Sequence, residues 1–193
     1  MATPAPPALV VVDMIGLFDF PGADAIAPAA LRAARSIHGL RERFNRRGWP
    51  VVFANDNFAR WQADFRELVA MASATPGHAG RIAALLQPLP DDHFILKPKH
   101  SAFLATALPV LLAKLGVRRI VLAGMALESC VLATAIDGNA REFEVAVVRD
   151  AVAGRRDLRA SSFKVLEGAA IAVTIDSARA VAWGARRRSQ ANA

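Results

Sequence analysis

The chain of 193 residues has a single cysteine, Cys130, and no tyrosine. One cysteine excludes an internal disulfide framework and any metal site built from several thiolates. No apolar run reaches the roughly 18 residues that a membrane-spanning helix needs, and the first residues lack the basic segment that opens a secretory signal peptide. We therefore expect a cytoplasmic protein without membrane contact, in which Cys130 is either a buried small side chain or a nucleophile.

Basic charge is in excess but is not concentrated. The chain has 24 basic and 17 acidic residues, a formal net charge of +7. The arginines are spread through helical stretches such as residues 32–47, and the only dense run is residues 186–188. Basic segments interleaved with aromatic residues, which are typical of single-strand binding, are absent from the sequence. The pattern indicates a solvated basic surface, and we expect no nucleic-acid partner.

Hydrophobic residues make up 54% of the chain and occur in short runs. Runs that are apolar at almost every position indicate strands covered on both faces, as in parallel sheets. They lie at residues 8–13, 49–55, 93–96, 119–124, 144–148 and 170–174. Segments with helical period lie between them, at residues 27–47, 105–115, 129–141 and 158–167.

This alternation of strands and helices predicts one α/β domain over residues 1–193. We expect a three-layer α/β/α arrangement around a six-stranded, mostly parallel, Rossmann-like sheet. The proline-rich residues 1–7 and the last residues, from about 186 to 193, are expected to be mobile ends.

Polar side chains follow the ends of several predicted strands. Asp13 ends the first strand, Asn55 and Asp56 end the second, and Lys97 follows the third. The fourth strand is followed by the segment that leads to Cys130. Because open parallel sheets bind ligands beyond the carboxyl ends of their strands, we expect these groups to converge on one edge of the sheet.

Cys130 lies between a predicted strand and a predicted helix. A thiol in the first turn of a helix is close to the positive end of the helix dipole and to unpaired backbone N–H groups, which lower its pKa. The same N–H groups can hold an oxyanion. Position alone fits a buried structural cysteine equally well, but Asp13 and Lys97 at the same edge favour a nucleophile with a low pKa.

Four motifs in order make the chain resemble a known superfamily. They are residues 10–14 (VVVDM), 55–58 (NDNF), 97–103 (KPKHSAF) and 124–131 (GMALESCV), and they span most of the chain. With these motifs the chain resembles the isochorismatase-like cysteine hydrolases, which include nicotinamidases and N-carbamoylsarcosine amidases.

The resemblance implies a catalytic triad of Asp13, Lys97 and Cys130. It also implies a non-proline cis peptide bond before Ala126, so that the amides of Ala126 and Cys130 form an oxyanion hole. It further implies the strand order 3-2-1-4-5-6, an isochorismatase-like hydrolase fold without a cofactor, and a homo-oligomer, either a dimer or a tetramer.

Two departures from the family pattern concern the site. Relatives often carry polar residues at the positions of Gly16 and Leu17, so their loss bears on the polarity of the substrate. Nicotinamidases carry Asp-x-His after the second strand for a metal, whereas this chain has Asp56 and Asn57 there. Zinc needs several nitrogen or sulfur ligands close together, and we therefore expect no metal site.

The resemblance implies hydrolysis of a C–N bond in a small amide, ureido or carbamoyl compound through a covalent acyl-enzyme. Two alternatives stay open: a catalytically silent binding protein with the same fold, and a metal-dependent nicotinamidase. His100 could approach the pocket because it is close to Lys97 in sequence. The candidate substrate-binding residues are Phe18, Asn55, Asp56, Trp61, Phe103 and Met125, with Phe58 as a further wall residue.

Aromatic side chains on an otherwise polar segment support the expected oligomer. Trp61 and Phe65 are four residues apart and would share one face of a helix. Exposed aromatic residues of this kind favour interfaces, although the same face could equally pack on its own sheet.

Overall fold

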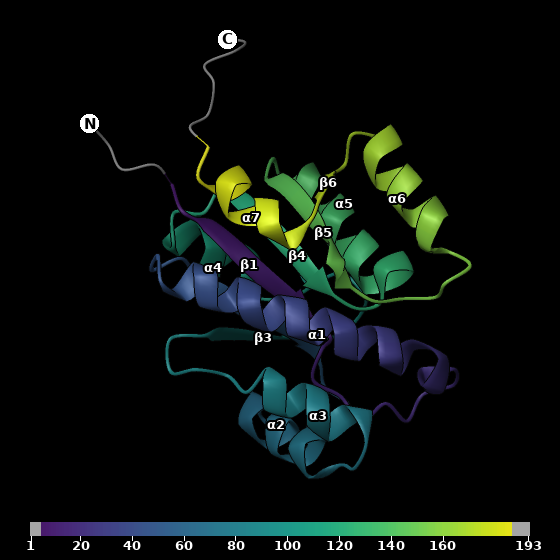
Figure 1. Cartoon of the computed structure of the whole chain (residues 1–193). Helices are drawn as coiled ribbons and strands as arrows, with labels where there is room; N and C mark the ends of the chain where they lie inside the picture. The colour runs from purple at the N-terminus through teal and green to yellow at the C-terminus, as the bar shows by residue number, and fades with distance from the viewer. Residues whose placement is uncertain (1–4, 187–193) are drawn as a thin grey trace.

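The computed structural model describes residues 5–186 and contains one six-stranded sheet. Its strand order is β3-β2-β1-β4-β5-β6, and every neighbouring pair is parallel. The α/β prediction and the implied strand order are confirmed (Figure 1). The strands are β1 (Pro7–Val12), β2 (Val51–Asp56), β3 (His93–Lys97), β4 (Arg119–Gly124), β5 (Glu144–Val152) and β6 (Val173–Ile175).

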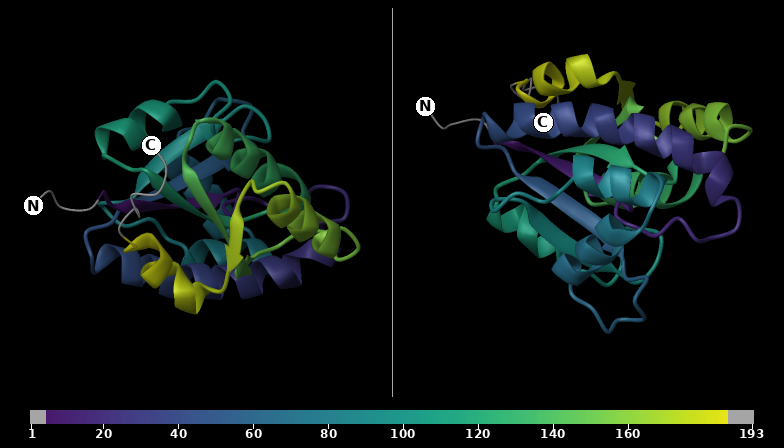
Figure 2. Two further views of the ribbon diagram at one scale, coloured as in Figure 1. Left: turned by 90° about the horizontal axis from the view of Figure 1, so that it is seen from above. Right: turned by 60° about the horizontal axis from the view of Figure 1, so that its bottom comes forward.

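Helices cover both faces of the sheet and give the three layers (Figure 2). The core on one face includes residues from α1 (Ala23–Asn45), α2 (Phe65–Ala74), α3 (His78–Leu85) and α7 (Ser177–Gly184). The core on the other face includes residues from α4 (Leu108–Lys114), α5 (Leu132–Ala140) and α6 (Arg159–Gly168). A π-helical turn, η1 (Leu127–Val131), joins β4 to α5.

Burial on both faces explains why the strands are apolar at successive positions. In β1, Leu9 and Val11 face the core under α1, whereas Val10 and Val12 face the core under α4 and α5. All four side chains are almost completely buried. Because a strand alternates its side chains between the two faces, only a run without polar interruptions satisfies both cores.

Several helix boundaries differ from the sequence prediction. α1 begins at Ala23 rather than at residue 27, with Pro28 inside the helix near its start. α4 begins at Leu108 rather than at residue 105, because Pro109 occupies a first-turn position that favours proline. Residues 129–141 form the turn η1 and α5 rather than one regular helix.

The helices α2, α3 and α7 were not predicted from the sequence. The start of α2 has a clear signal, since Asp64 and Glu67 form a reciprocal capping box at 2.9 and 2.7 Å. Trp61 lies before this helix, so the prediction that Trp61 and Phe65 share a helical face is wrong. Phe65 is buried and stacks on Phe94 of β3, with ring centroids 5.1 Å apart.

The ends predicted to be mobile lie mostly outside the described residues. Pro7 is the exception at the first end, because it is buried and begins β1. At the other end, the backbone carbonyl of Arg186 accepts a hydrogen bond from Arg119. Within residues 5–186 no helix has the length and apolar character needed to cross a membrane.

Candidate active site

Three side chains from different strand ends meet at the carboxyl edge of the sheet. The Lys97 ammonium lies 2.7 Å from the Asp13 carboxylate and 3.6 Å from the Cys130 sulfur. Asp13 follows β1, Lys97 ends β3, and Cys130 lies in η1 after β4. The prediction that these three side chains lie together at one edge of the sheet is therefore confirmed.

Backbone contacts fix the position of Asp13. Its amide donates to the Ala54 carbonyl at 3.0 Å, and its side chain accepts a 2.8 Å hydrogen bond from the Asp56 amide. On the other side, Gly124 approaches β1 so closely that an added Cβ would lie 2.0 Å from the Val12 carbonyl oxygen. A glycine is therefore required at the point where β4 turns toward Cys130.

Lys97 is 2% exposed and holds the centre of the site. Besides Asp13 and Cys130, its ammonium donates to the Lys99 carbonyl at 2.9 Å. An ammonium has three donors, and each has a partner here. Because a buried cation is costly unless it is paired and hydrogen-bonded, this arrangement holds the Asp13 carboxylate and the thiol at fixed distances from one charge.

Burial and the Asp13 carboxylate raise the pKa of the Cys130 thiol to about 11. Lys97 and a hydrogen bond from Ser129 lower the pKa of the thiol, but their effect is smaller than the rise. The prediction of a low-pKa thiol is therefore wrong. The reason is that the half-buried sulfur lies next to a carboxylate, and both effects favour the neutral thiol over the thiolate.

The same surroundings make Asp13 a stronger base. Burial raises the pKa of the Asp13 carboxyl, while the Lys97 ammonium opposes that rise. A thiol whose pKa is high needs a neighbouring base to remove its proton. The Asp13 carboxylate is hydrogen-bonded to Cys130 and is therefore a candidate for such a base.

A second polar pair reaches the sulfur of Cys130. His100 Nδ1 and Ser129 Oγ each lie 3.8 Å from Cys130 Sγ, and they lie 3.0 Å from each other. Ser129 was not predicted to be a site residue, and His100 was a candidate only because it is close to Lys97 along the chain. Sequence spacing alone does not show which loop residues face the thiol.

The backbone around Cys130 has an unusual form. The Met125–Ala126 peptide bond is cis, and Ala126 is the extended residue that precedes η1. The Ala126 carbonyl accepts hydrogen bonds from the amides of Ser129 and Val131, both at 3.1 Å. The amide of Cys130, which lies between those two residues, takes part in neither bond.

A cavity of about 300 Å³ opens beside the thiol. Four of the candidate substrate-binding residues line it, as does Phe58. They are Phe18, Asn55, Asp56 and Met125. Gly16 and Leu17, the two positions where relatives often carry polar residues, also belong to its wall.

Two candidate substrate-binding residues do not reach this cavity. Phe103 is 3% exposed and packs in the core against Phe143, because its place before α4 points it under the sheet. Trp61 is 58% exposed and lies in a left-handed conformation on the loop before α2. Within this chain neither side chain is part of the cavity wall.

Two asparagines support the loops of the site. Both amide protons of Asn55 are used, on the carbonyls of Ile15 and Asp56, so this side chain holds the wall in place although it also lines the cavity. Asn57 donates to Ala63 and accepts from the amide of Trp61, which closes the loop before α2. Asn57 thus has a structural use where the nicotinamidase pattern has a metal ligand.

Metal ligands are not grouped within residues 5–186. No set of three His, Cys, Asp or Glu side chains there is arranged to hold an ion. The residues near Asp56 therefore do not form a binding site for the metal of the nicotinamidase pattern.

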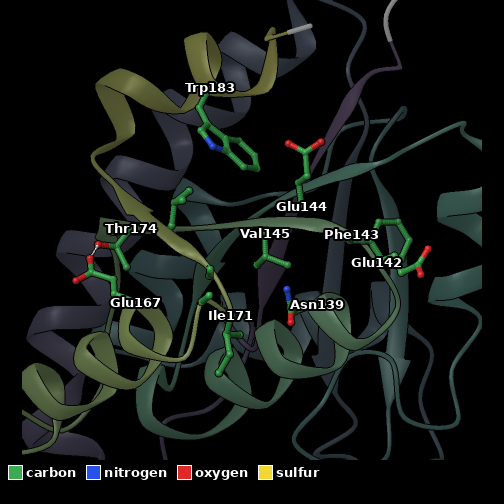
Figure 3. A pocket seen from close by; sticks show the side chains of 12 residues that line it. Asn139, Glu142, Phe143, Glu144, Val145, Glu167, Ile171, Thr174 and Trp183 are labelled. Atoms are coloured by element: carbon green, nitrogen blue, oxygen red, sulfur yellow. Dashed lines mark hydrogen bonds between the residues drawn. The ribbon is translucent and has the colours of Figure 1, made fainter. Parts of the chain in front are cut away.

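A larger cavity, of about 910 Å³, lies away from the thiol. Figure 3 shows it between β5, β6 and α7, with Glu144, Ile171 and Trp183 around it. Within residues 5–186 its wall has no cysteine, its one hydroxyl, that of Thr174, is hydrogen-bonded to Glu167, and the carboxylates of Glu144 and Glu167 are paired with Arg119 and Arg149. Size alone therefore does not identify the active site, and the smaller cavity beside Cys130 is the better candidate.

Known proteins are similar to this chain in sequence and in fold. The isochorismatase domain family matches residues 7–179. YaaI of Bacillus subtilis (strain 168), an uncharacterized isochorismatase family protein, is 36% identical over 150 residues, which cover 78% of this chain and 82% of that protein. A maleamate amidohydrolase of Pseudomonas putida is 30% identical over 155 residues, which cover 77% of this chain and 73% of that enzyme.

A solved structure agrees with these relationships. The crystal structure of N-carbamoylsarcosine amidase from Thermoplasma acidophilum aligns with a TM-score of 0.68 and 30% identity, covering 89% of this chain and 96% of that one. The match over residues 7–179 spans the sheet, the strand ends and the thiol. The chain therefore belongs to the isochorismatase family of hydrolases.

Proposed function

We propose that the protein is a cysteine amidohydrolase that cleaves a C–N bond in a small amide, ureido or carbamoyl compound. The observation that carries the proposal is the contact of Lys97 with both Asp13 and Cys130 beside a cavity of small-molecule size. Of the relatives named above, one is an amidohydrolase by name and one an amidase, which supports the same reaction class.

The first half of the reaction forms a thioester. Asp13 takes the proton from Cys130 as the sulfur attacks the substrate carbonyl carbon, so an S–C bond forms and a negative charge develops on the carbonyl oxygen. When that intermediate collapses, the C–N bond breaks and Asp13 returns its proton to the leaving nitrogen. General acid–base help of this kind contributes about 10²–10⁴-fold to a rate.

The second half releases the acid. Water attacks the thioester carbonyl while Asp13 takes its proton, and the S–C bond then breaks as Asp13 passes that proton to the sulfur, which restores the thiol and the carboxylate. The amides of Ala126 and Cys130 are our candidates for the groups that hold the oxyanion in both halves. One oxyanion-hole donor typically contributes about 10²–10³-fold to kcat.

The two alternative functions account less well for the site. A silent binding protein has no need for a buried Lys97 that contacts both a carboxylate and a thiol. A metal-dependent nicotinamidase needs ligands that the residues around Asp56 do not supply. The proposed reaction uses only side chains and amides that already lie together, and needs no cofactor.

The proposal is tested by screening small amides for ammonia release, with Cys130→Ala as the blank and EDTA in a parallel series. We expect release that depends on Cys130 and persists in EDTA. Release at the same rate by Cys130→Ala would contradict the proposal. Activity that EDTA abolishes and zinc restores would favour the nicotinamidase alternative.

A further inference from the structure

The cavity beside Cys130 has an apolar wall and acidic charge. Its larger apolar lining residues are Ile15, Leu17, Phe18, Phe20, Phe58 and Met125. Its charged lining residues are Asp13, Asp19 and Asp56, and among the described residues the lining includes no Lys, Arg or His. The Lys97 ammonium, which lies behind Asp13 and Cys130 and is not part of this lining, already binds Asp13, the Lys99 carbonyl and Cys130.

The two outer carboxylates have no cation beside them. Asp13 is paired with Lys97, but none of the ion pairs within residues 5–186 involves Asp19 or Asp56. Both side chains are exposed at the cavity mouth. A substrate that carried its own carboxylate would meet these charges with no arginine or lysine to bind it, although binding of such groups usually relies on a charge-assisted donor.

The size and the apolar surface of the cavity also favour an uncharged substrate. Leu17 adds an apolar surface, and nothing lies within 4 Å of the place where a Cβ of Gly16 would stand. The volume of about 300 Å³ is at the small end of ligand cavities. The wall therefore suits a compact apolar group better than a chain of polar atoms.

We propose that the site selects an uncharged amide with a small apolar acyl group and discriminates against amides that also carry a carboxylate. This inference rests on the proposed function. This specificity differs from that of the relative named maleamate amidohydrolase, because maleamate is an anion. Discrimination arises from two unpaired carboxylates at the mouth and from the lack of a cation in the lining.

The test compares two alkylating reagents of nearly equal shape, iodoacetamide and iodoacetate, on the whole protein at one pH. Each forms an S–C bond with Cys130 and releases iodide, so neither requires turnover of an amide. Their rate ratio on N-acetylcysteine gives the intrinsic preference. Repulsion between two unit charges a few ångströms apart in water lowers a rate constant by roughly fivefold.

We expect the protein to favour iodoacetamide by at least that factor beyond the small thiol. Asp19→Asn and Asp56→Asn should each reduce the preference, whereas Asp91→Asn, a change in the turn before β3, should leave it unchanged. A ratio equal to that of the small thiol, or in favour of iodoacetate, would overturn the inference while leaving the nucleophile intact. Failure of both reagents to label Cys130 would overturn the proposed function and the inference together.

A substrate panel gives the second measurement. Isobutyramide and benzamide should release ammonia with a higher kcat/KM than maleamate and succinamate, and by at least fivefold on the same electrostatic argument. Faster hydrolysis of the two acids would contradict the inference while supporting an amidohydrolase.

Discussion

Lys97 and Asp13 form an ion pair that spans the width of β2. Lys97 is the last residue of β3, Asp13 is the first residue after β1, and β2 lies between these two strands. Their charged atoms are nevertheless 2.7 Å apart, and both side chains are largely buried. A single buried contact thus joins two strand ends and places one cation against the proposed base and the nucleophile.

Replacing Lys97 with methionine keeps the length of the side chain and removes its charge. The Asp13 carboxylate is then buried without a cation beside it, and loss of one member of a buried ion pair costs about 3–5 kcal/mol. Because the ammonium opposes the rise in the pKa of Asp13, its removal raises that pKa further. Asp13 accepts a proton only when ionised, so the rise of activity with pH should move to higher pH.

Urea unfolding and a pH–rate profile measure both effects of Lys97→Met. Lys99→Met is the matched control, since Lys99 is exposed and contributes only its backbone carbonyl to the site. Equal stability and equal pH profiles for the two variants would contradict the role given to the ion pair.

Asp13→Asn should separate the reactivity of the thiol from turnover. The Asp13 carboxylate raises the pKa of Cys130, so its neutralisation lowers that pKa and leaves Lys97 to favour the thiolate. Alkylation by iodoacetamide at pH 8 should therefore be faster than in the parent protein. Ammonia release should fall by about 10²–10⁴-fold, the usual contribution of a general base. Slower alkylation would show that Asp13 does not hold the thiol in its neutral form.

Ser129→Ala tests the second polar pair at the sulfur. A hydrogen bond from Ser129 lowers the pKa of the thiol, so its loss should shift the pH dependence of alkylation upward. The rate at pH 8 should drop by roughly tenfold, the value of a hydrogen bond to a charged group. His100→Gln should have a smaller effect in the same direction, because His100 contacts Ser129 at 3.0 Å. Ser161→Ala, an exposed change in α6, is the control, and an equal rate in all three variants would exclude this role.

We propose that the protein is a dimer or a tetramer, in which the exposed Trp61 contacts a second copy. Trp61 is 58% exposed, so Trp61→Ala should change the free energy of unfolding by no more than about 0.5 kcal/mol, as surface changes usually do. It should weaken assembly in sedimentation experiments at micromolar concentration. Sedimentation of the parent protein as a fully active monomer of 20.6 kDa would rule out the assembly.

The sequence predicts the sheet well because its signal is local. Strands buried on both faces must be apolar at successive positions, and residues 119–124 match β4 without any shift. The strand ends then place Asp13 and Lys97 at one edge, because parallel strands share the direction of their ends. Their contact with one another follows from the strand order, which the family resemblance supplied.

Tertiary contacts decide what sequence patterns leave open. Phe103 resembles a wall residue in sequence but lies in the core, since the chain turns before α4. The direction of the shift in the pKa of Cys130 depends on burial and on Asp13, which lies 117 positions away in the chain (130 − 13). A helix terminus read from the sequence predicted the opposite direction.

The most direct measurement traps the proposed thioester. The protein is mixed with an amide that it hydrolyses, and the reaction is quenched in acid during turnover. The mass of the peptide that contains Cys130 is then measured by mass spectrometry. The account predicts an added mass equal to the acyl group of the substrate on Cys130, absent in Cys130→Ala and lost on longer incubation. Rapid ammonia release with no acyl group on that peptide at any quench time, together with activity in Cys130→Ala, would contradict it.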